Sequence, residues 1–137
     1  MRIMALDVGT RRIGVALSDE LLITAQGAET IERKEPDRDM ALIKDFASKN
    51  SVGEIVVGLP LNMNGSYSAK TKEVVQFMDG LSRSVGLPIT TWDERLTTVQ
   101  AERAMLEADL SRAKRRRRAD KVAAQIILQS YLDSRKK

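Results

Sequence analysis

Apolar residues recur along the chain with two spacings, and together these predict five strands and four helices. Residues 3–6 form an uninterrupted apolar run, which is typical of a strand buried on both faces of a sheet. Residues 13–18 alternate between larger apolar and small side chains, which also favours a strand. The predicted strands cover 3–6, 13–18, 25–31, 54–58 and 89–92. Short connections between the first three predict an antiparallel meander.

Apolar residues spaced three and four apart predict the helices. The first begins at Pro36, and the second extends from about Ser68 until Gly86 stops it. A Thr-x-x-Gln capping box at residues 97–100 begins a third, which ends near residue 108. The last covers residues 119–132, and the basic residues before it are expected in a loop or a frayed helix start. This order predicts an α/β fold, with a mixed five-stranded sheet, helices on both faces and right-handed crossovers between the later strands.

Composition narrows the possible chemistry. The 137 residues fit one domain covering 1–137, and they include no Cys and no His. Thiolate metal sites, histidine metal sites and Ser-His or Cys-His catalytic groups are therefore excluded. Any metal must be bound by oxygen atoms, which favours Mg²⁺ or Mn²⁺. No signal peptide opens the chain and no apolar stretch is long enough to span a membrane, so we expect a cytoplasmic protein.

The net charge of +4 conceals an uneven distribution. Residues 1–102 hold 12 basic and 15 acidic side chains, whereas residues 103–137 hold 11 basic and 4 acidic ones. Five basic residues are consecutive: Lys114, Arg115, Arg116, Arg117 and Arg118. Such a run suits a phosphate backbone, although an exposed loop without a partner would have the same composition.

Acidic residues occupy three unusual places in this predicted fold. Asp7 follows the first buried strand, Asp93 and Glu94 follow the last strand, and Asp120 opens an apolar helix face. Ligands of α/β sheets gather beyond the carboxyl ends of the strands, so these carboxylates could converge there. Two divalent cations would resolve their repulsion and activate water for phosphodiester hydrolysis.

Each acid also has a structural interpretation. Asp7 could end its strand by binding turn amides, and Asp120 could favour the positive end of its helix. Asp93 or Glu94 could pair with Arg95. The three positions taken together, with a basic run beside one of them, favour a nuclease.

Four segments resemble one known family in order along the chain. They are Ala5-Leu6-Asp7-Val8-Gly9-Thr10-Arg11-Arg12-Ile13-Gly14-Val15-Ala16, Val57-Gly58-Leu59-Pro60-Leu61-Asn62-Met63-Asn64-Gly65-Ser66, Asp93-Glu94-Arg95-Leu96-Thr97-Thr98, and the two parts of the last helix, Asp120-Lys121-Val122-Ala123-Ala124 and Ile127-Leu128-Gln129-Ser130-Tyr131-Leu132. The chain is thus similar to the YqgF/RuvX family of pre-16S ribosomal RNA nucleases, also described as Holliday-junction-resolvase-like. One departure is Asn64, where the family usually has Asp.

The resemblance implies an RNase H-like fold and metal-dependent cleavage of structured RNA, with a role in maturing the 5′ end of 16S ribosomal RNA. It implies Asp7, Glu94 and Asp120 as catalytic acids and as ligands of Mg²⁺ or Mn²⁺. Strand alternation sends Asp93 and Glu94 to opposite faces, so Asp93 stays in reserve. Arg11, Arg12, Arg95 and the basic run are candidates for binding substrate phosphates.

Three other functions stay open at this point. A Holliday junction resolvase would share the chemistry but act on branched DNA, as a two-fold dimer. A non-catalytic RNA- or ribosome-binding factor could keep the fold alone. The segment Asp7-Val8-Gly9-Thr10 also resembles the phosphate loop of actin-like ATPases, but those enzymes need two such lobes. Whether the protein is a monomer or a homodimer is not determined by the sequence.

Overall fold

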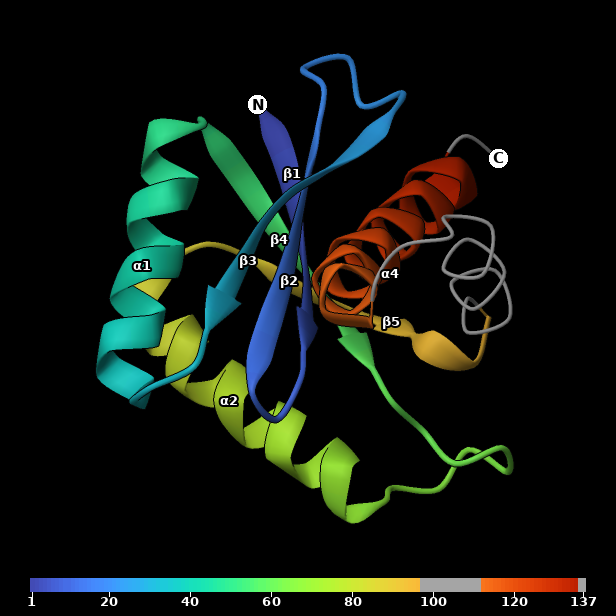
Figure 1. Ribbon diagram of the computed structural model, residues 1–137. Helices are drawn as coiled ribbons and strands as arrows, with labels where there is room; N and C mark the ends of the chain where they lie inside the picture. The colour runs from blue at the N-terminus through green and yellow to red at the C-terminus, as the bar shows by residue number, and fades with distance from the viewer. Residues whose placement is uncertain (97–111, 136–137) are drawn as a thin grey trace.

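The computed structural model describes residues 1–96 and 112–135, and five strands form one mixed sheet within them (Figure 1). The strands are β1 (Arg2–Val8), β2 (Arg12–Ser18), β3 (Ala25–Glu32), β4 (Val52–Leu59) and β5 (Ile89–Asp93). They lie in the order β3-β2-β1-β4-β5. The first three strands pair antiparallel, and β4 pairs parallel with both β1 and β5. The predicted strands and sheet type are confirmed.

The side chains of β1 alternate between two cores, one on each face of the sheet. Met4 and Leu6 enter the core below α1 and α2, whereas Ile3 and Ala5 enter the core below the C-terminal helix. All four are at least 97% buried, as the uninterrupted apolar run predicts. The strand is therefore fixed along most of its length, up to Asp7 near its end.

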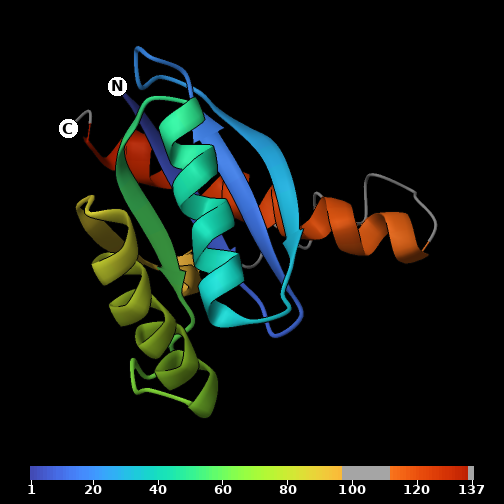
Figure 2. The same ribbon diagram turned by 90° about the vertical axis from the view of Figure 1, so that its left-hand side faces the viewer.

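Helices α1 (Pro36–Lys49) and α2 (Ala69–Val85) cover one face of the sheet (Figures 1 and 2). The side chains of Ser68 and Thr71 cap the first turn of α2 reciprocally. Gly86, at φ 66°, ends the helix in the left-handed conformation. The predicted limits of this helix are confirmed.

A single described helix, α4 (Arg112–Arg135), covers the other face. Small residues on that face let the helix approach the strands closely. The buried ones are Ala5, Ala16 and Ala25. At Gly27 an added Cβ would lie 3.1 Å from the Cβ of Lys121. This face gains its buried area from Ile127, Leu128 and Leu132 of the helix.

The prediction that the last helix begins at residue 119 was wrong, because α4 begins at Arg112. The basic run 114–118 is therefore helical and not a loop. Lys, Arg and Ala are good helix formers, and neither Gly nor Pro interrupts residues 112–120. The first turns of α4 extend beyond the β3 edge of the sheet (Figure 2). The helix predicted over 97–108 lies outside the described residues. Among the described helices, none is both long and apolar enough to cross a membrane.

Candidate active site

The carboxyl ends of β1, β4 and β5 lie at the same edge of the sheet, since these strands are parallel neighbours. Asp7 lies near this edge on β1, opposite Gly14 of β2. Leu6 and Val8 on either side of it enter the α1–α2 core, so strand alternation directs Asp7 to the α4 face. A partly buried carboxylate is thereby held at the place where ligands of such sheets bind.

Glu94 is the first residue of the short 3₁₀ turn η1 (Glu94–Leu96), which directly follows β5. Its carboxyl group is partly buried and shares a hydrogen bond with Asp7. Burial, followed by the negative charge of Asp7, raises the pKa of Glu94 to about 9. Glu94 therefore keeps its proton over the neutral pH range in the absence of a bound cation.

Asp93 has the opposite environment. Its carboxylate accepts hydrogen bonds from the guanidinium of Arg95, at 3.0 Å from Nε and 2.5 Å from Nη2, and from the backbone N–H of Arg95 at 3.0 Å. The side-chain hydrogen bond with Arg95 holds the pKa of Asp93 below its ordinary value. Of the two adjacent acids, Glu94 is thus the one that meets Asp7, while Asp93 is paired with Arg95.

Gly58 near the end of β4 makes the meeting of Asp7 and Glu94 possible. A Cβ at this position would lie 2.9 Å from Cγ and 3.0 Å from Cδ of Glu94, and 2.6 Å from Cδ1 of Ile127. Because these distances are far below van der Waals contact, any side chain here would displace Glu94, Ile127 or both. The glycine leaves the space on the α4 face that the Glu94 side chain fills.

Lys70, which sequence reasoning missed, supplies a cation beside the two acids. It lies in the first turn of α2, and its Nζ donates to Oγ1 of Thr10 at 3.1 Å. Its positive charge favours the ionised form of Glu94, against burial and Asp7. The contact joins residues 60 positions apart. No local pattern could identify it, although Lys70 follows the central family-like segment closely.

The turn after Asp7 is held by backbone contacts. The N–H of Gly9 donates to the carbonyl of Arg12 at 2.8 Å, and an added Cβ on Gly9 would lie 2.7 Å from that same oxygen. Nη1 of Arg33 donates to the carbonyl of Gly9 at 2.8 Å. Together with the contact of Lys70 on Thr10, these bonds fix the turn that follows the acid.

The three predicted phosphate-binding arginines have different environments. Arg11 is exposed and makes no ion pair with the described part of the chain. Arg12 pairs with Glu32 on the neighbouring strand, with Nε 3.5 Å from Oε1. Arg95 binds Asp93 and also donates from Nη1 to the carbonyl of Met63 at 3.0 Å. Only Arg11 is thus left available for a ligand without breaking an ion pair.

The third predicted acid, Asp120, belongs to α4 and lies seven positions before Ile127, about two helical turns. Its side chain, like those of the basic run 114–118, lies outside what the structure describes. Among the side chains that the structure describes, those of residues 1–95 and 121–135, no group of three or more His, Cys, Asp or Glu that could hold a metal ion is found. The described part of the site is therefore the pair formed by Asp7 and Glu94.

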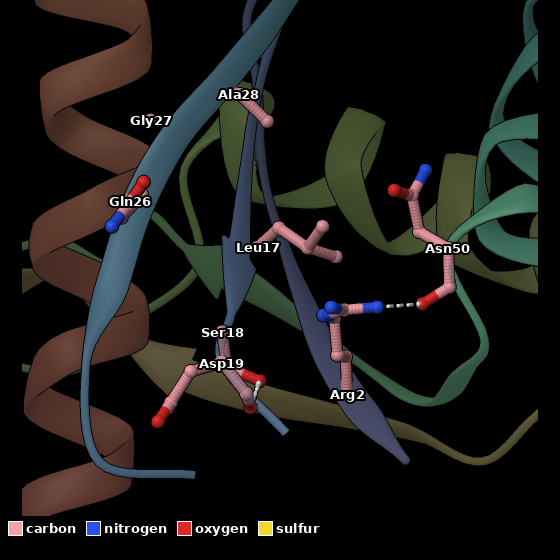
Figure 3. A pocket seen from close by; sticks show the side chains of 8 residues that line it. All are labelled: Arg2, Leu17, Ser18, Asp19, Gln26, Gly27, Ala28 and Asn50. Carbon is pink, nitrogen blue, oxygen red and sulfur yellow. Dashed lines mark hydrogen bonds between the residues drawn. The ribbon is translucent and has the colours of Figure 1, made fainter. Parts of the chain in front are cut away.

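A separate pocket of about 370 Å³ lies at the other end of the sheet (Figure 3). Arg2 at the start of β1, Ser18 at the end of β2 and Asn50 after α1 contribute to its lining. Nη1 of Arg2 already donates to the carbonyl of Asn50 at 3.2 Å. Arg2 lies at the start of β1 and Asp7 near its end, so the pocket belongs to a different part of the surface from the acid pair.

Comparison with known proteins places the chain in a family. A family model described as "RuvX: Holliday junction resolvase" matches residues 1–134. The chain belongs to the RuvX family. A relative from Halothermothrix orenii, named "Putative pre-16S rRNA nuclease", is 53% identical over 137 residues, which are 100% of this chain and 98% of the relative. A relative of the same name from Clostridium kluyveri is 56% identical over 133 residues, 97% of each chain.

Solved structures show which fold this RuvX-family chain shares. T. thermophilus RuvC in complex with Holliday junction substrate matches with a TM-score of 0.63 at 14% identity, covering 99% of this chain and 96% of RuvC. Fowlpox virus resolvase with Holliday junction DNA matches with a TM-score of 0.63 at 11% identity, covering 100% of both chains. The likeness confirms the RNase H-like fold.

The acid pair of this RuvX-family protein predicts how its stability depends on pH. The pKa of Glu94 is about 9 in the folded protein, against an ordinary value of 4.5 for a solvent-exposed Glu. Between these values the folded state keeps a proton that the unfolded state has released, so the free energy of unfolding falls as pH rises. We expect Glu94→Gln to flatten this decline, and the exposed Glu29→Gln to preserve it. Urea denaturation in EDTA at a series of pH values measures both. Equal slopes for wild type and Glu94→Gln would contradict the prediction.

A substitution at Gly58 tests the space that Glu94 occupies. We expect Gly58→Ala to displace the Glu94 carboxyl and to lower the affinity for Mn²⁺ at least about tenfold, measured by calorimetric titration. Gly53→Ala on the same strand is the matched control, because the three atoms nearest to an added Cβ there all belong to the side chain of Met1, the first residue of the chain, and not to the acid pair. An unchanged Mn²⁺ affinity in Gly58→Ala, with circular dichroism showing an intact fold, would refute this role of the glycine.

Proposed function

We propose that this RuvX-family protein is a metal-dependent nuclease that hydrolyses phosphodiester bonds of structured RNA and matures the 5′ end of pre-16S ribosomal RNA. The observation that carries the proposal is the pairing of Asp7 with Glu94 at the carboxyl edge of an RNase H-like sheet. The names of the H. orenii and C. kluyveri relatives support the choice of RNA. A role in ribosomal RNA processing would fit a cytoplasmic location.

The acid pair fits a divalent metal. Resolvases and nucleases of this family depend in general on divalent metal ions. The carboxyls of Asp7 and Glu94, which lie within hydrogen-bonding distance of each other, present oxygen donors to a cation, and Mg²⁺ or Mn²⁺ prefers oxygen ligands. Asp7, Glu94 and Asp120 would hold the metal. When bound, the metal lowers the pKa of water and stabilises charge on the phosphate.

The chain's own residues orient the acids and the substrate. The Asp93–Arg95 ion pair fixes the backbone on both sides of Glu94, and Gly58 leaves room for its side chain. Arg11 is exposed and offers a cation for the phosphate backbone, and Lys70, which also lies 3.8 Å from Glu73, adds a positive charge near Glu94. The basic residues 114–118 add affinity through phosphate contacts, which depend on shape and charge more than on base sequence. Arg95 is omitted from these substrate contacts because Asp93 and Met63 already occupy its donors.

Branched DNA is the second candidate substrate. The description of the family model favours it, and both structural neighbours above were solved with Holliday junction DNA. A resolvase makes two symmetric cuts and therefore needs two copies of the site in a two-fold dimer. A dimer that cleaves a four-way DNA junction faster than structured RNA would favour this candidate.

Replacing Asp7 tests the nuclease proposal. We expect the wild-type protein to cleave an RNA containing the 5′ end of the 16S precursor in the presence of Mg²⁺ or Mn²⁺. Asp7→Asn should slow cleavage at least about a hundredfold, because it removes a charged metal ligand. Asp79→Asn, an exposed position on α2, is the matched control and should retain the wild-type rate.

Rates are compared by gel assay with RNA in excess, and a four-way DNA junction serves as the second substrate. Cleavage by Asp7→Asn at the wild-type rate would contradict the metal mechanism. A wild-type protein that binds the RNA but cleaves neither substrate would instead favour a non-catalytic binding factor.

A further inference from the structure

The loop between β4 and α2 exposes an apolar tip. Met63 is 85% exposed and Tyr67 is 52% exposed, whereas Leu59 just before the loop is buried in the α1–α2 core. Single exposed apolar side chains are common on proteins and need no explanation by themselves. What distinguishes Met63 is the set of hydrogen bonds that closes its loop and the contact that joins this loop to Arg95.

The loop, residues 61–67, is a small closed turn. Leu61 and Tyr67 form an isolated antiparallel bridge. The N–H of Gly65 donates to the carbonyl of Asn62 at 2.8 Å, and the N–H of Asn62 donates to the carbonyl of Ser66 at 2.9 Å. Gly65 has φ 87°, which suits the glycine that follows a tight turn in a three-residue hairpin loop.

Side chains close the same turn from inside. Oδ1 of Asn64 accepts from both the N–H and the Oγ of Ser66, at 2.9 and 2.6 Å. Nδ2 of Asn62 donates to the same Oγ at 2.9 Å. The polar side chains of the turn are therefore used within it. These hydrogen bonds constrain the backbone of the tip that carries Met63.

Arg95 attaches this tip to the acid pair. Its Nη1 donates to the carbonyl of Met63 at 3.0 Å, while Nε and Nη2 bind the carboxylate of Asp93. Glu94, the partner of Asp7, is the residue between Asp93 and Arg95. One guanidinium thus fixes an exposed methionine relative to the place where the backbone of a nucleic acid would be cut.

We propose that Met63 packs against an unstacked base of the bound nucleic acid, next to the phosphate at the acid pair. Apolar side chains inserted at base steps are a known way for proteins to recognise and hold distorted nucleic acid. A continuous helix offers no free base face at this point, whereas a bulge, a branch or a helix end does. The protein therefore prefers nucleic acid with a break in base stacking. The inference rests on the proposed function for the position of the substrate.

The exposed leucine Leu21 provides a matched comparison for Met63. Leu21 is 76% exposed and belongs to the connection between β2 and β3. This connection lies at the end of the sheet opposite the carboxyl end of β1 (Figure 1). Neighbouring Glu20 pairs with Arg2 at the start of β1, which places this connection at the amino end of that strand. Leu21 is thus similarly exposed but far from the acid pair.

The test measures binding without cleavage, by fluorescence anisotropy with the full chain in an Asp7→Asn background. The probes are an RNA hairpin with one unpaired base, the same hairpin fully paired, and the bulged hairpin made as DNA. We expect Met63→Ala to weaken binding of the bulged RNA about tenfold and to leave the paired RNA unchanged, since a buried methionine side chain is worth about that factor. Met63→Leu should retain most of the preference, and Leu21→Ala should alter neither affinity. If Met63→Ala weakens binding of the bulged RNA but not of the bulged DNA, the contact is specific to RNA.

A second readout follows the base itself. The unpaired base is replaced by the fluorescent base 2-aminopurine. The fluorescence of this base should differ between the complex with Asp7→Asn and the complex with the double variant that also carries Met63→Ala. Two results would overturn the inference: Met63→Ala binds both RNAs as tightly as its Asp7→Asn parent, or it loses the same factor of affinity for the bulged and the paired RNA. Either result would leave the tip for another partner, such as a protein.

The outcome of this binding test can be distinguished from the outcome of the nuclease test. Loss of bulge preference in Met63→Ala, in a protein whose wild type does not cleave, would support the inference and refute the nuclease proposal. Cleavage by wild type together with unchanged binding by Met63→Ala would do the reverse.

Discussion

The meeting of two carboxyl groups, Asp7 and Glu94, is the constraint on which the rest of the site depends. Burial and mutual repulsion oppose it, and the raised pKa of Glu94 expresses that cost. The sheet order brings the two groups together, because β4 alone separates β1 from β5 and all three strands end at one edge. Gly58 of that intervening strand has no side chain, so Glu94 can lie across it toward Asp7.

One face of the sheet contributes mainly to stability, and the other carries the acid pair. On one face, α1 and α2 bury large side chains such as Leu6, Ile55 and Leu81, which hold the strands in place. On the other, small residues let α4 approach, and the acids lie on the same side. Fixed strands matter for the proposed metal site, because such a site needs its ligands held in place by surrounding packing and hydrogen bonds.

Much of this architecture follows from local sequence patterns. The apolar run before Asp7, the cap at Ser68 and the stop at Gly86 each act over a few residues, so periodicity and turn chemistry predict them. The choice between Asp93 and Glu94 could not be made in this way. Alternation shows only that neighbouring side chains diverge, whereas the 3₁₀ turn after β5 and the guanidinium of Arg95 decide which acid meets Asp7. The contacts of Lys70 with Thr10 and of Arg95 with Met63 join residues 60 and 32 positions apart, beyond the reach of any local pattern.

The most direct test of the central claim is the position of a bound metal. Crystals soaked in Mn²⁺ and measured at the manganese absorption edge locate the ion by anomalous scattering. The account predicts a peak bound by carboxylate oxygens of both Asp7 and Glu94, with Asp93 still paired to Arg95. A peak bound by Asp93 with Glu94 turned away, or full Mn²⁺ binding elsewhere on the protein with none at the pair, would contradict it.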